Sequence, residues 1–260
     1  AKKAGVKNTI ARVRNPDYRQ QIRDMKDELG ISMIVNPEKE TAEEIFNLIN
    51  LPSISQMEHF AKGKALLAEI VVDEGCSLIG ETLISLGKQL KTKVLVCAVQ
   101  RGDDVIIPSG TFMFEEGDRV HFTSDANSLR DFLAEAKLEK LPFKNIMIIG
   151  GSRTAYYLAK YLLSVGKSVK LIELSPERAR ELEESLDGAS VICGDGSDKA
   201  VLMEEGVESA GAFVALTNMD EENILLSLYA KSVGNAKLVT KINRVDYDGV
   251  VKHLDLDSTV

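Results

Sequence analysis

The residues with the clearest chemical potential form a glycine-containing turn just past the midpoint of the chain. The apolar run IMIIG leads into Gly150-Gly151-Ser152-Arg153-Thr154-Ala155 and then into an amphipathic segment. In a G-x-G-x-x-G turn, the first glycine makes the tight turn, the second lets a pyrophosphate approach the backbone, and the third permits close helix packing. Ser152 replaces the second glycine and places a hydroxyl where phosphates would lie. Amides at the start of the following helix still favour an anion.

An acidic residue ends the next predicted strand. The strand KLIE closes at Glu173, which lies 23 residues after Gly150. An acid about 20 residues beyond the first glycine commonly bonds the ribose diol of an adenine dinucleotide. Glu173 therefore favours NAD or an adenine nucleotide over a ligand with a 2'-phosphate.

Two further polar turns follow apolar strands. ASVICG runs into Asp195, which with the next amides could read an adenine edge, and GAFVALT ends at Thr217. Ligands of open α/β sheets bind beyond the carboxyl ends of the strands. With the turns at Gly150 and Glu173, four such turns follow one another along the chain, which favours nucleotide binding over a scaffold without a ligand. The structural alternative for single residues is that Asp195 and Asp220 simply cap helices.

A parallel sheet must position these turns. Residues 144–260 alternate five near-continuous apolar strands with helical patterns, which is typical of a sheet covered on both faces. A six-stranded nucleotide fold starting at Ile146 needs more chain than remains before Val260. We therefore expect residues 144–260 to be a Rossmann-like domain that is truncated at its C-terminal end and lacks its last strand.

Residues 51–143 follow a different pattern. Pro52 and a polar stretch mark a boundary over 51–63, where no strand is expected. A compact α+β module follows, with glycine turns over 110–118 that suit closely spaced antiparallel strands. We predict strands or helices in this order: strand 66–72, helix 77–90, strands 94–99, 104–108 and 118–124, and helix 127–138.

The first 50 residues predict strand, helix, strand, helix, at 8–13, 18–29, 31–35 and 37–51. Residues 1–18 align with 230–247 at a constant offset, with Gly5 matching Gly234. This internal repeat indicates that residues 1–50 are the C-terminal part of a first nucleotide domain. It also raises the idea that Ile31–Val35 of one copy supplies the missing last strand to another within a dimer or ring.

Composition excludes several classes of function. Forty acidic against 32 basic residues give a net charge of −8, which argues against a nucleic-acid surface. No run of apolar residues suits a membrane span or a signal peptide. Three widely spaced cysteines suggest reduced core residues and a cytoplasmic setting. The histidines lie away from the strand ends, so catalysis has little support, and no metal-ligand cluster is evident.

A family resemblance rests on several segments taken together: GGSRTAYYLA, the acid in LIEL, CGDGSD, ALTNMDEENILLSLYAKSVG and the module with GTFMFEEGDRVHF. The chain resembles the Trk-type potassium uptake regulators of the RCK (KTN) family. This resemblance implies Rossmann-like domains joined by a small α+β subdomain. It also implies a regulatory, non-enzymatic protein that is cytoplasmic and peripheral at the inner face of the membrane. Such a protein assembles as dimers or rings, contacts a potassium transporter, and responds to NAD(H) or ATP/ADP.

The resemblance also implies which residues hold the ligand. Carried over by position, they are Gly150, Gly151, Ser152, Arg153, Glu173, Asp195 and Thr217. Arg153 would neutralise a phosphate, and Arg12 and Arg14 would be remnants of a lost first site. Two alternatives stay open: an NAD-dependent oxidoreductase, and the cytoplasmic gating module of a potassium channel or antiporter.

Overall fold

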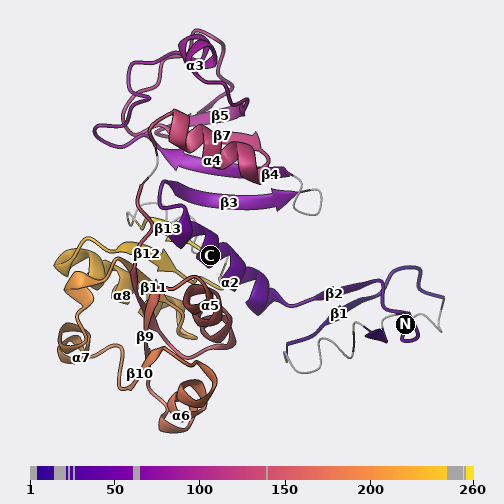
Figure 1. The fold of residues 1–260 in the computed structure, drawn as a ribbon, viewed down its shortest axis with the longest axis vertical. Coiled ribbons are helices and arrows are strands. Elements are labelled where there is room, and N and C mark those ends of the chain that lie inside the picture. Colours follow the sequence, from indigo (N-terminus) through magenta and orange to yellow (C-terminus); the bar gives the residue numbers. More distant parts are fainter. Residues whose placement is uncertain are drawn as a thin grey trace.

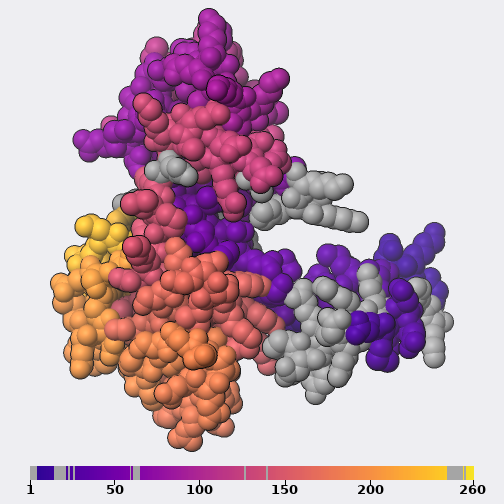
Figure 2. All heavy atoms as spheres, viewed as in Figure 1, coloured from indigo at the N-terminus to yellow at the C-terminus, as the bar shows by residue number. Residues whose placement is uncertain are grey.

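The computed structural model describes residues 5–14, 22, 24, 25, 27–60, 65–138, 140–244, 254 and 256–260. It shows two lobes and a side arm (Figure 1). The space-filling view shows the small lobe above the larger one, with the arm standing away from both (Figure 2). The predicted helix over 18–29 and the repeat partners Tyr18 and Tyr247 lie wholly or largely outside the described residues.

The larger lobe is a Rossmann-like domain, as predicted. Its six strands are all parallel and lie in the order β10-β9-β8-β11-β12-β13. The central strand β11 is buried along its whole length, which explains its continuous apolar sequence. The elements are β8 (Asn145–Ile149), α5 (Arg153–Ser164), β9 (Ser168–Glu173), α6 (Pro176–Ser185), β10 (Ser190–Cys193), α7 (Lys199–Glu204), the short 3-10 helix η3 (Val207–Ser209), β11 (Ala212–Ala215), α8 (Asp220–Val233), β12 (Lys237–Thr240) and β13 (Ser258–Thr259).

The expectation that this sheet lacks its last strand is wrong. β13 pairs in parallel with β12 and fills the sixth position. Its two residues are polar, so no apolar run marked them as a strand. The idea that Ile31–Val35 fills this place is also wrong, because β2 (Met33–Val35) pairs with β1 (Ile10–Arg12) in its own two-stranded sheet.

The small lobe is an antiparallel sheet with two helices. Its strand order is β3-β4-β7-β5-β6, and α4 packs on one face through Phe122 and Phe132, whose rings lie 5.0 Å apart. The elements are β3 (Ile54–Phe60), β4 (Ala65–Val71), α3 (Leu83–Gln89), β5 (Leu95–Arg101), β6 (Asp104–Ile106), β7 (Arg119–Ser124) and α4 (Ala126–Glu135).

Three details of the small lobe differ from the sequence prediction. Strand β3 occupies the segment that was expected to be a boundary. The sequence did not indicate this strand because a bulge near Ile54 buries two adjacent residues, which breaks the period-two pattern. Helix α3 begins only after Thr82, which forms a capping box with Ser85. Residues 110–118 form a loop with one bridge, between Thr82 and Met113, rather than paired strands.

The arm joins the larger lobe through one helix. α2 (Pro37–Asn50) is capped by Asn36 and packs Ala42, Ile45 and Ile49 into the same core as α5. The Asn36 amide donates to the Tyr157 hydroxyl at 3.1 Å within this contact. A helix predicted as the tail of a first domain therefore packs on the second. The β1–β2 pair is parallel, as is the β12–β13 pair.

The cysteines are free thiols, but the prediction that all belong to the core is wrong. Cys97 and Cys193 are exposed, and Cys76 is half-buried. Cys193 is the last residue of strand β10, at the edge of the sheet, where a side chain reaches solvent. Among the described residues, no helix combines the length and hydrophobicity needed to cross a bilayer.

The two lobes meet at β12 and β13. The Lys237 ammonium donates to the carbonyl oxygens of Pro52 and Ile54 at 3.1 and 2.6 Å, and the Ser258 hydroxyl donates to the Ser55 carbonyl at 2.8 Å. Lys237 is only 8% exposed. Burial lowers the pKa of its ammonium to about 8, although Asp257 opposes this shift.

This buried lysine predicts a stability increase at alkaline pH. The unfolded lysine keeps its proton up to about pH 10.4, whereas the folded one releases it near pH 8. Between these values the unfolded state binds more protons, so the free energy of unfolding rises with pH, by about 3 kcal/mol at most. Chemical denaturation at several pH values checks this. Lys237→Met lacks the group, and an equal pH slope in both proteins would contradict the prediction.

Candidate functional site

The predicted strand-end turns converge on one pocket. The cavity has a volume of about 330 Å³ and lies beyond the carboxyl ends of β8, β9 and β11, near the Gly194–Asp195 turn that follows β10. Six of the seven predicted residues line it, whereas Arg153 does not. The lining residues predicted from the sequence are Gly150, Gly151, Ser152, Glu173, Asp195 and Thr217. The topology therefore brings together positions that are up to 67 residues apart in the chain.

Gly150 is required by the shape of the turn. Its φ of +93° favours glycine, and a Cβ there would lie 2.9 Å from the Leu216 carbonyl oxygen and 3.1 Å from the Thr217 nitrogen. Its amide donates to the Ile172 carbonyl at 2.9 Å, continuing the sheet. The turn after β8 thus touches the turn after β11, and no side chain fits between them.

Gly151 is required by a different neighbour. Its amide donates to the Glu173 carboxylate at 2.5 Å, and a Cβ would lie 2.5 Å from the Leu182 side chain. The sequence motif assigns the second glycine to phosphate approach. Here the adjacent glycine instead lets the acid of β9 approach the turn. Glu173 is thereby fixed at the edge of the pocket.

Ser152 acts as the N-cap of α5. Its hydroxyl accepts a hydrogen bond from the Ala155 amide at 3.2 Å. The hydroxyl is therefore engaged with the helix, and the first-turn amides that precede Ala155 have no acceptor within the helix. This arrangement leaves an anion-binding helix start beside the pocket, despite the departure from the glycine motif.

The capping role of Ser152 gives a prediction. Ser152→Ala lowers the free energy of unfolding by about 1 kcal/mol, whereas Ser152→Gly costs only a few tenths, because glycine is tolerated at an N-cap. Nucleotide affinity of Ser152→Gly stays within about threefold of the unaltered chain, because backbone amides supply the anion contacts. Denaturation curves and titration calorimetry check both parts. A large affinity loss in Ser152→Gly would show instead that the hydroxyl itself binds the ligand.

Glu173 presents a carboxylate that is already oriented. Oε2 accepts from the Gly151 amide, and Oε1 accepts from the Ser175 amide at 2.8 Å. An ionised carboxylate accepts about four hydrogen bonds, so each oxygen keeps capacity for a hydroxyl of the ligand. This geometry suits a ribose diol and opposes a second negative charge.

Arg178 is a pocket residue that the sequence analysis missed. Its Nε donates to the Gly151 carbonyl at 2.8 Å, and its guanidinium pairs with Glu181 at 2.8 Å. Arg178 lies in the first turns of α6, just beyond Glu173. The motifs that point to the site select residues directly after strands, and Arg178 lies in a helix. A basic residue shortly after the ribose-binding acid was the available signal.

Asp195 lines the pocket together with Thr217, and neither Asp195 nor Asp220 caps a helix. The Asp195 carboxylate accepts from the Ser197 hydroxyl and amide at 2.7 and 2.8 Å, and these bonds hold its pKa below the usual value. It does not cap a helix, because Asp198 caps α7. Asp220 likewise is not a cap, since Met219 occupies that position in α8. Asp220 instead binds the Asn243 and Arg244 amides.

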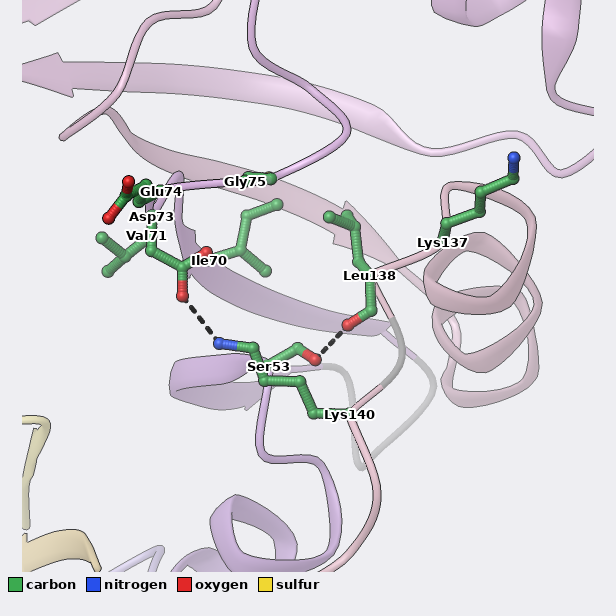
Figure 3. Close-up of a pocket in the computed structure, with 10 residues that line it drawn as sticks. Ser53, Ile70, Val71, Asp73, Glu74, Gly75, Lys137, Leu138 and Lys140 are labelled. Carbon is green, nitrogen blue, oxygen red and sulfur yellow. Dashed lines mark hydrogen bonds and ion pairs between the residues drawn. The ribbon is translucent and has the colours of Figure 1, made fainter. Parts of the chain in front are cut away.

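Pocket size does not distinguish this site from others in the chain. A pocket of about 320 Å³ lies beside Ser53, Asp73 and Lys140 in the small lobe (Figure 3). Lys140 crosses it to pair with Asp73 at 2.7 Å. The lining of that pocket includes a glycine turn at Gly75 but no start of a helix. The pocket at Gly150 is selected by its chemistry.

Comparison with known proteins identifies the family. The TrkA-N domain model matches residues 146–260, and the TrkA-C domain model matches residues 67–137. These two matches correspond to the larger and small lobes. The chain belongs to the TrkA domain family. The resemblance noted in the sequence is thereby confirmed, as is the Rossmann-like fold class.

Relatives in this family are named as potassium uptake proteins. The chain is 33% identical to the Trk system potassium uptake protein TrkA of Vibrio alginolyticus, covering 94% of the chain and 54% of that protein. It is 31% identical to the TrkA homolog of Archaeoglobus fulgidus, covering 99% of the chain and 58% of that protein. The chain thus spans somewhat more than half the length of these relatives.

Solved structures with this fold include an RCK domain and a channel. The GsuK RCK domain superposes with a TM-score of 0.65 at 19% identity, covering 97% of the chain and 53% of that domain. The GsuK channel bound to NAD superposes with the same TM-score, at 19% identity, covering 97% of the chain and 44% of that protein. At this identity, the similarity establishes the arrangement of both lobes.

Proposed function

We propose that this chain is the nucleotide-sensing part of a regulatory subunit that controls potassium uptake. Its ligand is NAD(H) or an adenine nucleotide, ADP or ATP, held in the pocket at the Gly150 turn. The subunit is cytoplasmic and works at the inner face of the membrane, on an integral membrane potassium transporter. It associates with further copies of itself in a dimer or ring.

The observation that carries this proposal is the Glu173 carboxylate fixed beside the glycine turn. Two backbone amides orient it, and the start of α5 lies next to it in the same pocket. An acid for the ribose and a helix start for the phosphates are the two elements of adenine-dinucleotide recognition. The names of the relatives, with the fold shared with an NAD-bound channel, support potassium uptake as the regulated process.

The lining of the pocket supports sensing over turnover. Among the described residues that line it, none is a histidine, cysteine, lysine or tyrosine. The carboxylates and hydroxyls that do line it can also serve enzymes, but Glu173 accepts from the Gly151 and Ser175 amides and the Ser152 hydroxyl caps α5. In a regulator, the nucleotide acts by binding one conformation more tightly than another, which shifts the equilibrium between them.

Titration calorimetry of the chain with ADP, ATP, NADH and NADPH tests the proposal. We expect saturable binding of at least one of the first three, and weaker binding of NADPH because its 2'-phosphate meets Glu173. No binding of ADP, ATP or NADH would overturn the proposal. Steady consumption of NADH with a panel of small carbonyl substrates would favour the oxidoreductase alternative instead.

A further inference from the structure

Strand β12 has buried polar contacts at both ends, with the pocket turn through Asn223 at one end and with the small lobe through its own Lys237 at the other. All four of its residues are buried, although Lys237 and Thr240 are polar. In the sheet it lies between β11, which ends at the pocket, and β13, which touches the small lobe. β12 therefore connects the pocket side of the larger lobe with the side that faces the small lobe.

The pocket end of β12 is fixed by Asn223. This side chain is fully buried, and its Oδ1 accepts from the Thr217 amide at 2.9 Å. Its Nδ2 donates to the Lys241 carbonyl at 2.9 Å, directly after β12. Asn223 therefore bonds the Thr217 turn of the pocket to the end of β12. A further buried bond of 2.7 Å joins the Ser227 and Thr240 hydroxyls.

The other end of β12 is fixed to the small lobe by Lys237. Its ammonium donates to the carbonyls of Pro52 and Ile54, where the chain enters that lobe. The neighbouring strand adds the bond from Ser258 to Ser55. Both ends of β12 thus carry buried polar contacts, whose loss leaves unsatisfied groups.

The segment that Lys237 holds is also bonded to the chain leaving the small lobe. The Ser53 hydroxyl donates to the Leu138 carbonyl, and Lys140 pairs with Asp73 (Figure 3). The segment that enters the lobe before β3 and the loop after β4 are therefore both bonded to the linker that leaves the lobe. The Pro52–Ile54 segment is thus bonded to Lys237 on one side and lies next to a residue bonded to the linker on the other.

We propose that β12 couples occupancy of the nucleotide pocket to the position of the small lobe, with Asn223 and Lys237 as positioning residues. This inference rests on the proposed nucleotide function. Ligand contacts at the Thr217 turn shift Asn223 and hence β12, and Lys237 passes that shift to residues 52–54. A two-state element that both sites bias is the physical requirement for such coupling.

Hydrogen exchange of the chain, measured with saturating ADP and with saturating NADH, tests the coupling. We expect the bound nucleotide to slow exchange at residues 150–155 and, by about fivefold or more, at residues 51–58. In Lys237→Met the slowing at 51–58 falls below about twofold, while that at 150–155 persists, because Lys237 does not line the pocket.

Lys170→Met is the matched control. Lys170 also lies in a strand of this sheet, and its ammonium donates to a backbone carbonyl, that of Glu205 at 2.7 Å, but this partner belongs to the same lobe. We expect this variant to keep the response at 51–58. If Lys237→Met does not fold by circular dichroism, Ser258→Ala removes the neighbouring contact and should at least halve that response.

The results distinguish a failure of the coupling from a failure of the proposed nucleotide function. A full response at 51–58 in the folded Lys237→Met or Ser258→Ala chain overturns the coupling. So does protection at 150–155 of the unaltered chain without any change at 51–58. If neither ADP nor NADH protects residues 150–155 in the unaltered chain, the nucleotide function itself fails, and the coupling inference falls with it.

Discussion

Gly150→Ala is expected to weaken nucleotide binding by about 100-fold and to destabilise the larger lobe by about 3 kcal/mol or more. The added Cβ would lie 2.9 Å from the Leu216 carbonyl oxygen and 3.1 Å from the Thr217 nitrogen, both of which belong to backbone. Backbone cannot rotate away, so the two turns must separate. With φ at +93°, the alanine is also strained.

The loss of affinity follows from the same displacement. Moving the turn misaligns the amides at the start of α5, and two charge-assisted hydrogen bonds are worth about 3 kcal/mol together. That free energy corresponds to about 100-fold in the dissociation constant. Calorimetry with ADP and NADH measures the affinity, and urea denaturation measures the stability.

Gly166→Ala is the control for backbone strain. Gly166 has a φ of +75° in the same lobe, but a Cβ there meets nothing within 4 Å. This variant carries only the conformational cost of about 1–2 kcal/mol and should bind nucleotide normally. If Gly150→Ala loses no more stability or affinity than Gly166→Ala, the contact between the two turns contributes to neither stability nor nucleotide binding.

The core of the larger lobe could be predicted from sequence because its burial is uniform. Strands such as β8 and β11 are buried on both faces, so their apolar runs are continuous, and the order of the strand-end turns follows from the parallel topology. The convergence of Gly150, Glu173 and Thr217 follows directly from that topology. Prediction succeeded where the local pattern and the fold carry the same information.

Elements with weak local patterns could not be predicted. β13 consists of Ser258 and Thr259, which become a strand only because β12 offers an edge. β3 is obscured by its bulge near Ile54. In both cases tertiary pairing decides the structure, and residue type contributes little.

The directions of side chains at the site also could not be predicted from the sequence. Ser152 was expected to face the phosphates, yet its hydroxyl caps α5. Arg178 reaches the pocket from a helix, and Asn223 connects two backbone segments that are adjacent only in the folded sheet. Spacing along the chain places Cα atoms on elements, whereas these roles depend on rotamers.

Glu173→Gln is expected to weaken binding of ADP and NADH by about 10-fold to 100-fold, the value of one charge-assisted hydrogen bond. The carboxylate now accepts from the Gly151 and Ser175 amides and keeps both oxygens for the ribose. A glutamine has a single acceptor oxygen, so one of these two amides would face an NH₂ group. The hydroxyl contacts then become weaker, and the acid that repels a 2'-phosphate is gone.

Selectivity is therefore the decisive measurement for this residue. NADPH should lose less affinity than NADH in Glu173→Gln, so the preference for NADH shrinks by about tenfold, because removing one charge relieves a like-charge repulsion of about that size. Glu177→Gln is the matched control, since Glu177 is exposed in the first turn of α6 and does not line the pocket. Equal losses for NADH and NADPH would mean that Glu173 only holds the Gly151 turn in place, and that another group reads the ribose.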